Sequence, residues 1–379
     1  MKISEIIVEN RKPTFKLNEV GMAHAEDIIF YEGSAGALRV INSFKHLPKT
    51  RDTALTIKWD GQVALFAGRD VSGTFIMTDM AGWTAKGYNG LYTSVKDFLA
   101  QKRSKGGNEE FLSKIAALWP IMESAFPPGY KGFVKGDVMW WPGNLQDNGK
   151  SFVFGEGTTK YEIDKTTELG HRVGQGQAGF AVHGYCKTTE DKVPEPLKTT
   201  AGLNINSQLC VLGPEIKVQG DVQMDKRKFK ETTDYVRKNA KAIDGFLNTE
   251  TLQANKMSGL PDMLYTFVNQ QTKIRDLDNL ASKFGTWVQQ NPKLSKPMVA
   301  KVQEYIKANP AGLKAIFNVF DAVTSLKHDI IGQLDNNNNG VYAHINGERG
   351  GEGYVLFDEG GYIKLVNRLH FSAANFGNH

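Results

Sequence analysis

The spacing of apolar residues changes near residue 222, and this change constrains the fold more than any other feature of the sequence. Before that point, short apolar runs such as residues 132–141 and 179–186 predict strands. From 222 to 334, apolar residues recur every three or four positions, which predicts helices interrupted by prolines. Strand patterns return after the polar tract at 336–339. We therefore predict an α+β protein. Residues 1–221 and 335–379 would form mainly antiparallel sheets with flanking helices, and residues 222–334 would form an inserted all-helical subdomain.

Composition is that of an ordinary globular protein, with a mild preference for an anionic partner. Hydrophobic residues make up 40% of the chain and its formal net charge is +5. Residues 222–330 hold 17 Lys and Arg against 11 Asp and Glu, so the positive balance lies in the predicted helical subdomain. Cys186 and Cys210 lack the spacing of a metal or redox motif, which favours a reducing compartment. The sequence has no evident signal peptide and no apolar run of bilayer-spanning length, so we expect a cytoplasmic protein.

The stretch from residue 53 to residue 70 carries the first candidate for chemistry. Two short apolar runs flank Lys58, Trp59, Asp60 and Gly61. Because Asp-Gly is a frequent turn pair, we expect a tight hairpin that leaves Lys58 at the end of a strand, facing inward. A lysine in a partly dry pocket can lose its proton and act as a nucleophile. The alternative is a lysine whose stem only covers apolar surface.

Three further strand-like stretches each carry one charged residue of interest. Residues 132–141 contain Asp137, residues 350–357 contain Glu352, and residues 360–371 contain Lys364. With Lys58, the order along the chain is lysine, acid, acid, lysine. This order resembles the covalent nucleotidyltransferase superfamily of ATP-dependent DNA ligases, RNA ligases and mRNA capping enzymes. Residues 58–61 resemble its KxDG motif and residues 352–355 resemble its EGxV motif, and the likeness is closest to phage-type RNA ligases.

The resemblance implies a ligase adenylation fold and a three-step reaction. Lys58, within a motif completed by Asp60 and Gly61, would take AMP from ATP. Asp137 and Glu352 would hold Mg²⁺ or Mn²⁺, Glu352 would also contact the nucleotide, and Lys364 would stabilise charge on the α-phosphate. AMP would then pass to a 5′-phosphate end, which a 3′-hydroxyl would attack to seal the strand. RNA ends are favoured, with DNA or mixed ends possible.

Other residues could hold the nucleotide. The resemblance implies a basic residue shortly after the KxDG motif, for which Arg69 and Lys86 are the candidates. It also implies an aromatic residue that stacks on the purine, for which Phe180 in the strand 179–186 is the candidate; a core phenylalanine is the alternative. If the alternation of that strand is regular, His183 lies on the opposite side from Phe180.

The sequence departs from the family pattern in several places. Val63 stands where many ligases have an arginine, and Val366 stands where the final KxK motif has its second lysine, so Arg368 or another basic residue would have to substitute. We expect no C-terminal OB-fold, which favours the RNA-ligase branch. Two alternatives stay open: another nucleotidyl transfer, either GTP capping or AMP transfer to a protein, and a non-catalytic nucleic-acid-binding relative.

The basic residues of the helical segment give a candidate nucleic-acid interface. Lys230, Arg237 and Lys241 fall near one face of a predicted helix, beside or opposite the apolar residues Phe229, Val236 and Ile243. Lysine and arginine neutralise phosphates, which is the main source of affinity for nucleic acid. The alternative is a helix face that is only solvated.

Overall fold

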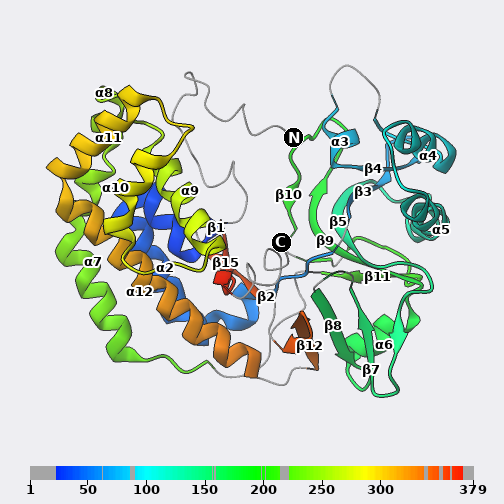
Figure 1. The fold of residues 1–379 in the computed structure, drawn as a ribbon. Coiled ribbons are helices and arrows are strands. Elements are labelled where there is room, and N and C mark those ends of the chain that lie inside the picture. Colours follow the sequence, from blue (N-terminus) through cyan, green and yellow to red (C-terminus); the bar gives the residue numbers. More distant parts are fainter. Residues whose placement is uncertain are drawn as a thin grey trace. The chain divides into compact units, whose positions relative to one another are not determined.

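A computed structural model describes residues 23–61, 63–85, 90–155, 157, 159–197, 199–200, 202–213, 222–336, 340–349, 353–358 and 361–369. The chain divides into two compact units. The helical unit comprises Met1–Ala54, Asp221–Gln333 and Val355–His379, and the strand unit comprises Leu55–Gly220 and Leu334–Tyr354. Figure 1 labels the elements of both units, and the predicted α+β class is confirmed.

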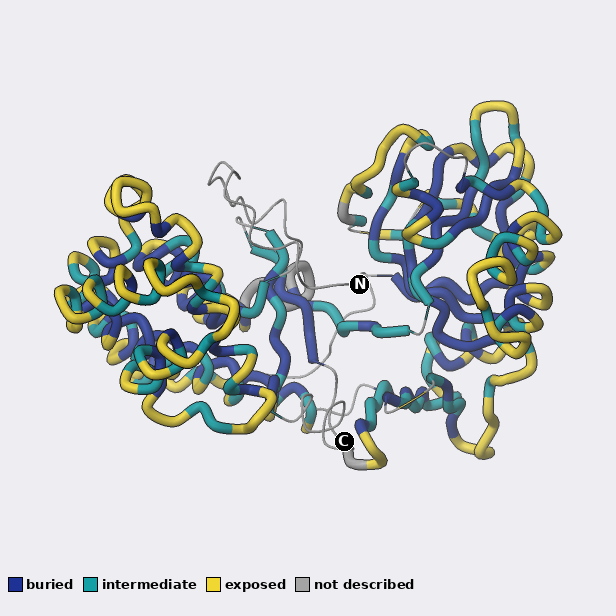
Figure 2. Tube along the Cα trace, turned by 45° about the horizontal axis from the view of Figure 1, so that its top comes forward, coloured by how far each residue is buried: buried dark blue, intermediate teal, exposed yellow. Residues whose placement is uncertain are grey.

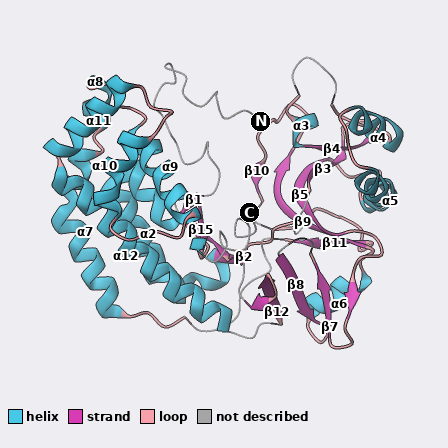
Figure 3. Cartoon of the chain, viewed as in Figure 1, coloured by secondary structure: helices cyan, strands magenta, loops and turns pink. Residues whose placement is uncertain are grey.

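The helical unit is built from long helices that bury one apolar face each. Its helices are α2 (Ile28–Ala54), α7 (Lys226–Phe246), α8 (Thr249–Ala254), α9 (Leu260–Lys273), α10 (Leu280–Gln290), α11 (Lys296–Ala308) and α12 (Pro310–Asn336), the last of which runs on past the unit boundary (Figure 3). The side chains of Phe229, Val236 and Ile243 on α7 are buried, as the helical spacing predicts. Asp225 caps this helix by accepting from the N–H groups of Arg227 and Lys228.

Strands at the two ends of the chain also belong to this unit. Strand β1 (Ala23–His24) runs parallel to β15 (Gly361–Leu365), with His24 opposite Lys364. Strand β14 (Tyr354–Asp358) lies on the other side of β15. A short 3₁₀ helix, η2 (Ala25–Asp27), connects β1 to α2. The sequence-based division instead placed these segments with the predicted sheets.

The larger sheet of the strand unit supplies its core. Its strands run in the order β10 (Glu195–Pro196), β9 (Ala178–Cys186), β5 (Gly132–Trp140), β3 (Ala64–Arg69) and β4 (Phe75–Asp79), and β11 (Leu209–Leu212) pairs with β9. All pairs along this order are antiparallel, and β11 runs parallel to β9. Helices α4 (Val95–Ser104) and α5 (Glu109–Ala125) contribute side chains to one core cluster with this sheet, and Figure 2 shows its central strands as buried.

A second, antiparallel sheet completes the strand unit. Its strands run in the order β13 (Glu348–Arg349), β12 (Val341–Ile345), β8 (Thr159–Asp164), β7 (Ser151–Phe154) and β6 (Gln146–Asp147). Helix α6 (Glu168–Gln175) contacts β7 and β8, and α3 (Met80–Trp83) follows β4. The residue pairs of β12 with β8 bring chain segments about 180 positions apart into one sheet.

The predicted hairpin at Asp60 and Gly61 is wrong. Strand β2 (Leu55–Ile57) ends before Lys58 and does not pair with β3, because the two strands belong to different sheets. Gly61 does not adopt the positive φ of a tight turn. The segment between them instead carries the chain from one sheet to another. No helix in the described part of the chain combines the length and apolar character needed to cross a membrane.

Candidate active site

Lys58 directly follows a strand, as predicted, and its side chain is largely buried. The ammonium Nζ lies 3.1 Å from Oδ2 of Asp60, and the two side chains are 15% and 40% exposed. The amine is therefore held in a sheltered position, while the carboxylate can be reached from solvent. This is an arrangement in which a lysine can be presented to a substrate.

The residues around Lys58 fix its backbone. The Asp60 N–H donates a 2.8 Å hydrogen bond to the Tyr161 hydroxyl, which donates in turn to the Lys58 carbonyl at 3.4 Å. The Trp59 side chain is buried, and its ring lies 5.1 Å from that of Tyr161 and 6.5 Å from that of Phe154. Trp59 thus anchors the segment in the core. Its neighbours Lys58 and Asp60 are more exposed, so successive side chains alternate as they do in a strand.

Gly61 is required by a close approach of two chain segments. A Cβ atom at this position would lie 2.5 Å from the Val138 carbonyl oxygen and 2.8 Å from Cβ of Asp137. The Val138 N–H also donates to the Val63 carbonyl at 3.0 Å. The structure therefore brings Gly61, in the segment of Lys58, against Asp137, 76 positions later in the chain.

Asp137 lies in the middle of β5, opposite Ala64 of β3 and Ala181 of β9. Its carboxylate is 17% exposed, and Oδ2 lies 3.1 Å from Nε2 of His183. Regular alternation of residues 179–186 predicts that His183 lies on the side of β9 away from Phe180, but it does not predict the pairing with Asp137. Regular alternation could have supplied only the shared face, because the residue pairing depends on the register between β5 and β9.

The segment that resembles EGxV is described from Gly353 onward. The Lys58 N–H donates to the Gly353 carbonyl at 3.0 Å, so this segment runs beside Lys58. The Tyr354 hydroxyl donates to Asp335 at 2.7 Å, which ties the segment to the end of α12. Glu352 itself lies outside the described residues, as does Lys86.

Lys364 belongs to the helical unit, where it lies on β15 opposite His24. Arg368, considered as a substitute for the missing second lysine, is buried and paired. Its guanidinium donates to Asp27 at 2.7 Å and also bonds Asn269, and Glu26 lies 3.5 Å away. These partners commit Arg368 to the interior of the helical unit and leave it unsuited to contacting a nucleotide.

The chain belongs to DUF6267, a family of unknown function, whose model matches residues 20–379. No curated protein and no solved structure matches the chain. The family assignment therefore names no activity.

Two expected nucleotide contacts are not supported by the structure. Phe180 is 0% exposed and packs in the core of the larger sheet, where a Cβ on Gly136 would lie 2.7 Å from its ring. Arg69 donates from Nε to the Phe126 carbonyl at 2.6 Å. Its two terminal nitrogens donate to the backbone carbonyls of Gly73 and Glu123, each at 2.9 Å. Phe180 is thus a core residue, and Arg69 secures the end of β3 to the end of α5.

The donor set partly fits a divalent cation. Asp137 is a hard oxygen donor with a partly exposed carboxylate, and Mg²⁺ beside nucleotides commonly uses one or two carboxylates plus phosphate oxygens. Within the described ranges, no group of three or more His, Cys, Asp or Glu side chains is placed to hold a metal. Asp137 is suited to supply one carboxylate to a cation that is shared with a nucleotide.

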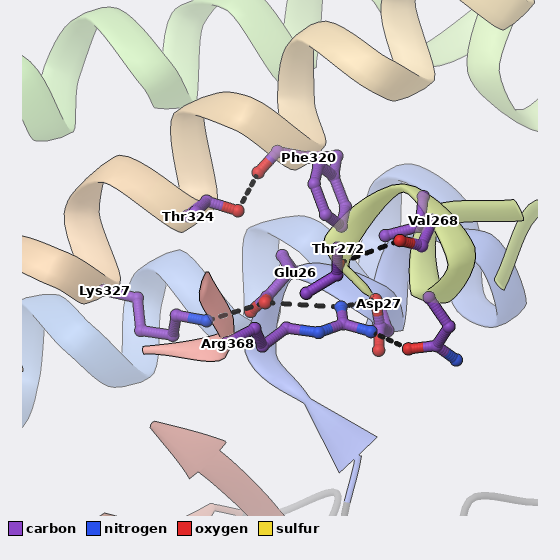
Figure 4. Close-up of polar contacts among 9 residues, drawn as sticks. Glu26, Asp27, Val268, Thr272, Phe320, Thr324, Lys327 and Arg368 are labelled. Carbon is purple, nitrogen blue, oxygen red and sulfur yellow. Dashed lines mark hydrogen bonds and ion pairs between the residues drawn. The ribbon is translucent and has the colours of Figure 1, made fainter. Parts of the chain in front are cut away.

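A buried charge cluster in the helical unit was not predicted (Figure 4). Lys327 of α12 is fully buried and donates to Glu26 at 2.6 Å, and Arg368 pairs with Asp27. Burial disfavours ionised Glu26, but Lys327 and Arg368 outweigh this effect and lower its pKa to about 2. Burial raises the pKa of Asp27 to about 6, although Arg368 opposes the shift.

The predicted nucleic-acid residues lie on α7 as expected from the helical spacing. Lys230, Arg237 and Lys241 are exposed, whereas Val236 and Ile243 are buried. Lys230 donates to Asp234 at 2.6 Å, one turn later on the same helix. The basic face of α7 is therefore accessible to solvent. The carboxylate of Asp234 balances the charge of Lys230.

Proposed function

We propose that this chain is an ATP-dependent polynucleotide ligase that forms a covalent lysyl-AMP at Lys58. The observation that carries the proposal is the convergence of three segments in the strand unit. Asp60 lies 3.1 Å from the Lys58 ammonium, Gly61 presses against Asp137, and the Lys58 N–H bonds Gly353. These are the segments that resemble the KxDG motif, the third-motif acid and the EGxV motif.

The chemistry assigned to Lys58 is nucleophilic displacement. The neutral amine attacks the α-phosphorus of ATP, a nitrogen–phosphorus bond forms, and the bond to the pyrophosphate oxygen breaks. An ordinary lysine has a pKa of about 10.4, so a proton must leave before or during the attack. Asp60 is within hydrogen-bond reach of Nζ and is positioned to orient the amine and to accept that proton.

Charge stabilisation falls to Asp137, Glu352 and Lys364 in this proposal. Asp137, with Glu352, would hold Mg²⁺ or Mn²⁺, which when bound neutralises negative charge on the phosphates. Lys364 would offset the charge that develops on the α-phosphate. The resemblance supplies these two roles, and the chemical types of the residues are compatible with them.

The later steps of the proposed reaction require the protein to bind nucleic acid. AMP would pass to a 5′-phosphate end, and a 3′-hydroxyl would displace it, with RNA favoured and DNA or mixed ends possible. The accessible basic face of α7 supports a polyanionic partner, because exposed Lys and Arg side chains neutralise phosphates without a large desolvation cost. A cytoplasmic location is part of the same proposal.

The proposal is tested by incubating the protein with α-labelled ATP or GTP and Mg²⁺, followed by denaturation. Label retained from ATP is the expected result. Label from GTP alone would favour a capping activity instead, and no label from either nucleotide would favour a non-catalytic nucleic-acid-binding relative. If ATP labels the protein, 5′-phosphorylated RNA and DNA ends, supplied separately, identify the strand that is sealed.

A further inference from the structure

A β-bulge in β9 places His183 beside Asp137. Lys135 pairs with Gly184 and the next residue, Gly136, pairs with Val182, so His183 is the extra residue of the bulge. Its neighbours Phe180 and Val182 enter the core cluster on one face of the sheet, whereas His183 lies on the face of Asp137. Bulges often redirect a side chain next to a functional site.

The contact between His183 and Asp137 is partly buried but remains accessible to solvent. The His183 side chain is 33% exposed and the Asp137 side chain is 17% exposed, with 3.1 Å between Nε2 and Oδ2. Gly61 also lies against this aspartate, since a Cβ there would lie 2.8 Å from Cβ of Asp137. Asp137 thus contacts both the segment of Lys58, through Gly61, and an imidazole that binds one of its carboxylate oxygens.

We propose that His183 is a positioning residue that orients the Asp137 carboxylate for a divalent cation. The imidazole engages Oδ2 and restricts rotation of the carboxylate, which leaves Oδ1 as the oxygen offered to the cation. Partners that orient a metal-binding carboxylate typically change metal affinity or activity by about 10- to 100-fold when removed. This inference rests on the metal role given to Asp137 in the proposed function.

The test measures Mn²⁺ binding directly, by loss of the free-ion electron paramagnetic resonance signal, in protein held in excess over a bound ATP analogue whose α- and β-phosphates are joined by a methylene group. His183→Ala removes the contact, whereas His183→Gln keeps a nitrogen donor at a similar distance from the backbone. His171→Ala is the matched control, because His171 is an exposed histidine of the same unit on α6. Thermal unfolding of each variant identifies any loss of folded protein.

The expected result is a Kd for Mn²⁺ about 10-fold or more weaker in His183→Ala, with partial recovery in His183→Gln and no change in His171→Ala. Asp137→Asn should weaken binding at least as much as His183→Ala. Equal Mn²⁺ affinity in wild type and His183→Ala would overturn the inference, as would an equal loss in His183→Ala and His183→Gln. Because this analogue cannot transfer AMP, the outcome is independent of whether ATP labels Lys58. Failure of the analogue to bind the wild-type protein would count against the proposed function, and so is distinguished from failure of the inference.

Discussion

The ammonium of Lys58 lies 3.1 Å from the carboxylate of Asp60, two residues further along the same segment. A neighbouring carboxylate favours the charged form of an amine. If Lys58 is the nucleophile, its charged amine must therefore lose a proton when ATP binds. The proton could pass to Asp60, or charges around the bound phosphates could disfavour the charged amine. In the proposed reaction, Asp60 would hold the Lys58 amine in place beforehand, and the amine would lose its proton during the attack.

The first prediction concerns this nucleophile. Lys58→Ala should abolish the covalent AMP adduct, and Lys58→Arg should do so as well, because arginine stays protonated and cannot attack. The adduct is measured by label retained after denaturation with α-labelled ATP. Lys187→Arg is the control, since Lys187 is an exposed lysine of the same unit. Label retained in either Lys58 variant would rule out this attachment point.

The second prediction concerns Gly61. Gly61→Ala introduces a Cβ that would lie 2.5 Å from the Val138 carbonyl oxygen, so β5 and the Lys58 segment must separate. Overpacking of this kind costs about 1–3 kcal/mol of the free energy of unfolding, and adduct formation should fall with it. Urea unfolding measures the first effect. Gly129→Ala is the control, because nothing lies within 4 Å of a Cβ added there. Equal stability of the two variants would contradict the close approach.

Sequence patterns predicted the elements of this protein better than its long-range contacts. Short apolar runs located β5 and β9, and apolar residues at helical spacing located the helices from 226 onward. The Asp-Gly pair was misleading, because a local turn signal cannot reveal that Gly61 approaches a strand 76 positions away. The pairing of His183 with Asp137 depends on a bulge in the register between two strands, which single-strand patterns do not contain.

Burial was equally hard to infer for individual polar and aromatic residues. Phe180 fits both a stacking and a core role by type, and only its packing against the larger sheet decides for the core. The ion pair between Lys327 and Glu26 joins residues 301 positions apart, so neither flanking sequence marks its partner. Charged residues are rarely buried unless they are paired, and the pairing is a property of the folded chain.

The third prediction follows from the buried cluster and concerns pH. The pKa of Asp27 is raised to about 6 in the folded protein, so its contribution to stability is fully present below pH 3.8 and is lost as pH rises through 6. The pKa of Glu26 is lowered to about 2, so its contribution is present above pH 4.5 and is lost as pH falls toward 2. Together, these two groups favour the fold most near pH 4, and most of the Asp27 contribution is lost by pH 6.

The variant Asp27→Asn tests the contribution of Asp27 alone to the pH dependence of stability. Wild type should gain on the order of 2 kcal/mol of unfolding free energy relative to Asp27→Asn between pH 7 and pH 4.5, measured by urea unfolding at each pH. The asparagine cannot titrate, so its profile should lack this gain. Glu304→Gln, which removes an exposed carboxylate of the helical unit on α11, is a comparison for a general effect of carboxylate loss. Parallel pH profiles for wild type and Asp27→Asn would contradict the raised pKa.

The last prediction separates the chemistry at Lys58 from the grip on nucleic acid. Reversing Lys230, Arg237 and Lys241 to Glu should weaken binding of single-stranded RNA and lower sealing, while formation of the AMP adduct stays nearly unchanged. Each phosphate contact contributes about −0.7 to the slope of log affinity against log salt for single strands, so losing up to three contacts should flatten the slope by about 2. The carboxylate of Asp234 balances Lys230, so this residue should contribute least of the three.

The matched control for charge is the reversal of Lys293, Lys301 and Lys307, which are exposed in the same unit, at or near α11. Both triple variants change the net charge by −6 at pH 7, so a non-specific effect of charge would weaken RNA binding equally in the two. A specific interface on α7 requires a larger loss, and a flatter salt dependence, in the α7 variant alone. Equal loss of adduct formation and RNA binding would indicate a folding defect, which thermal unfolding would reveal. Unchanged RNA binding would show that the basic face of α7 is only solvated.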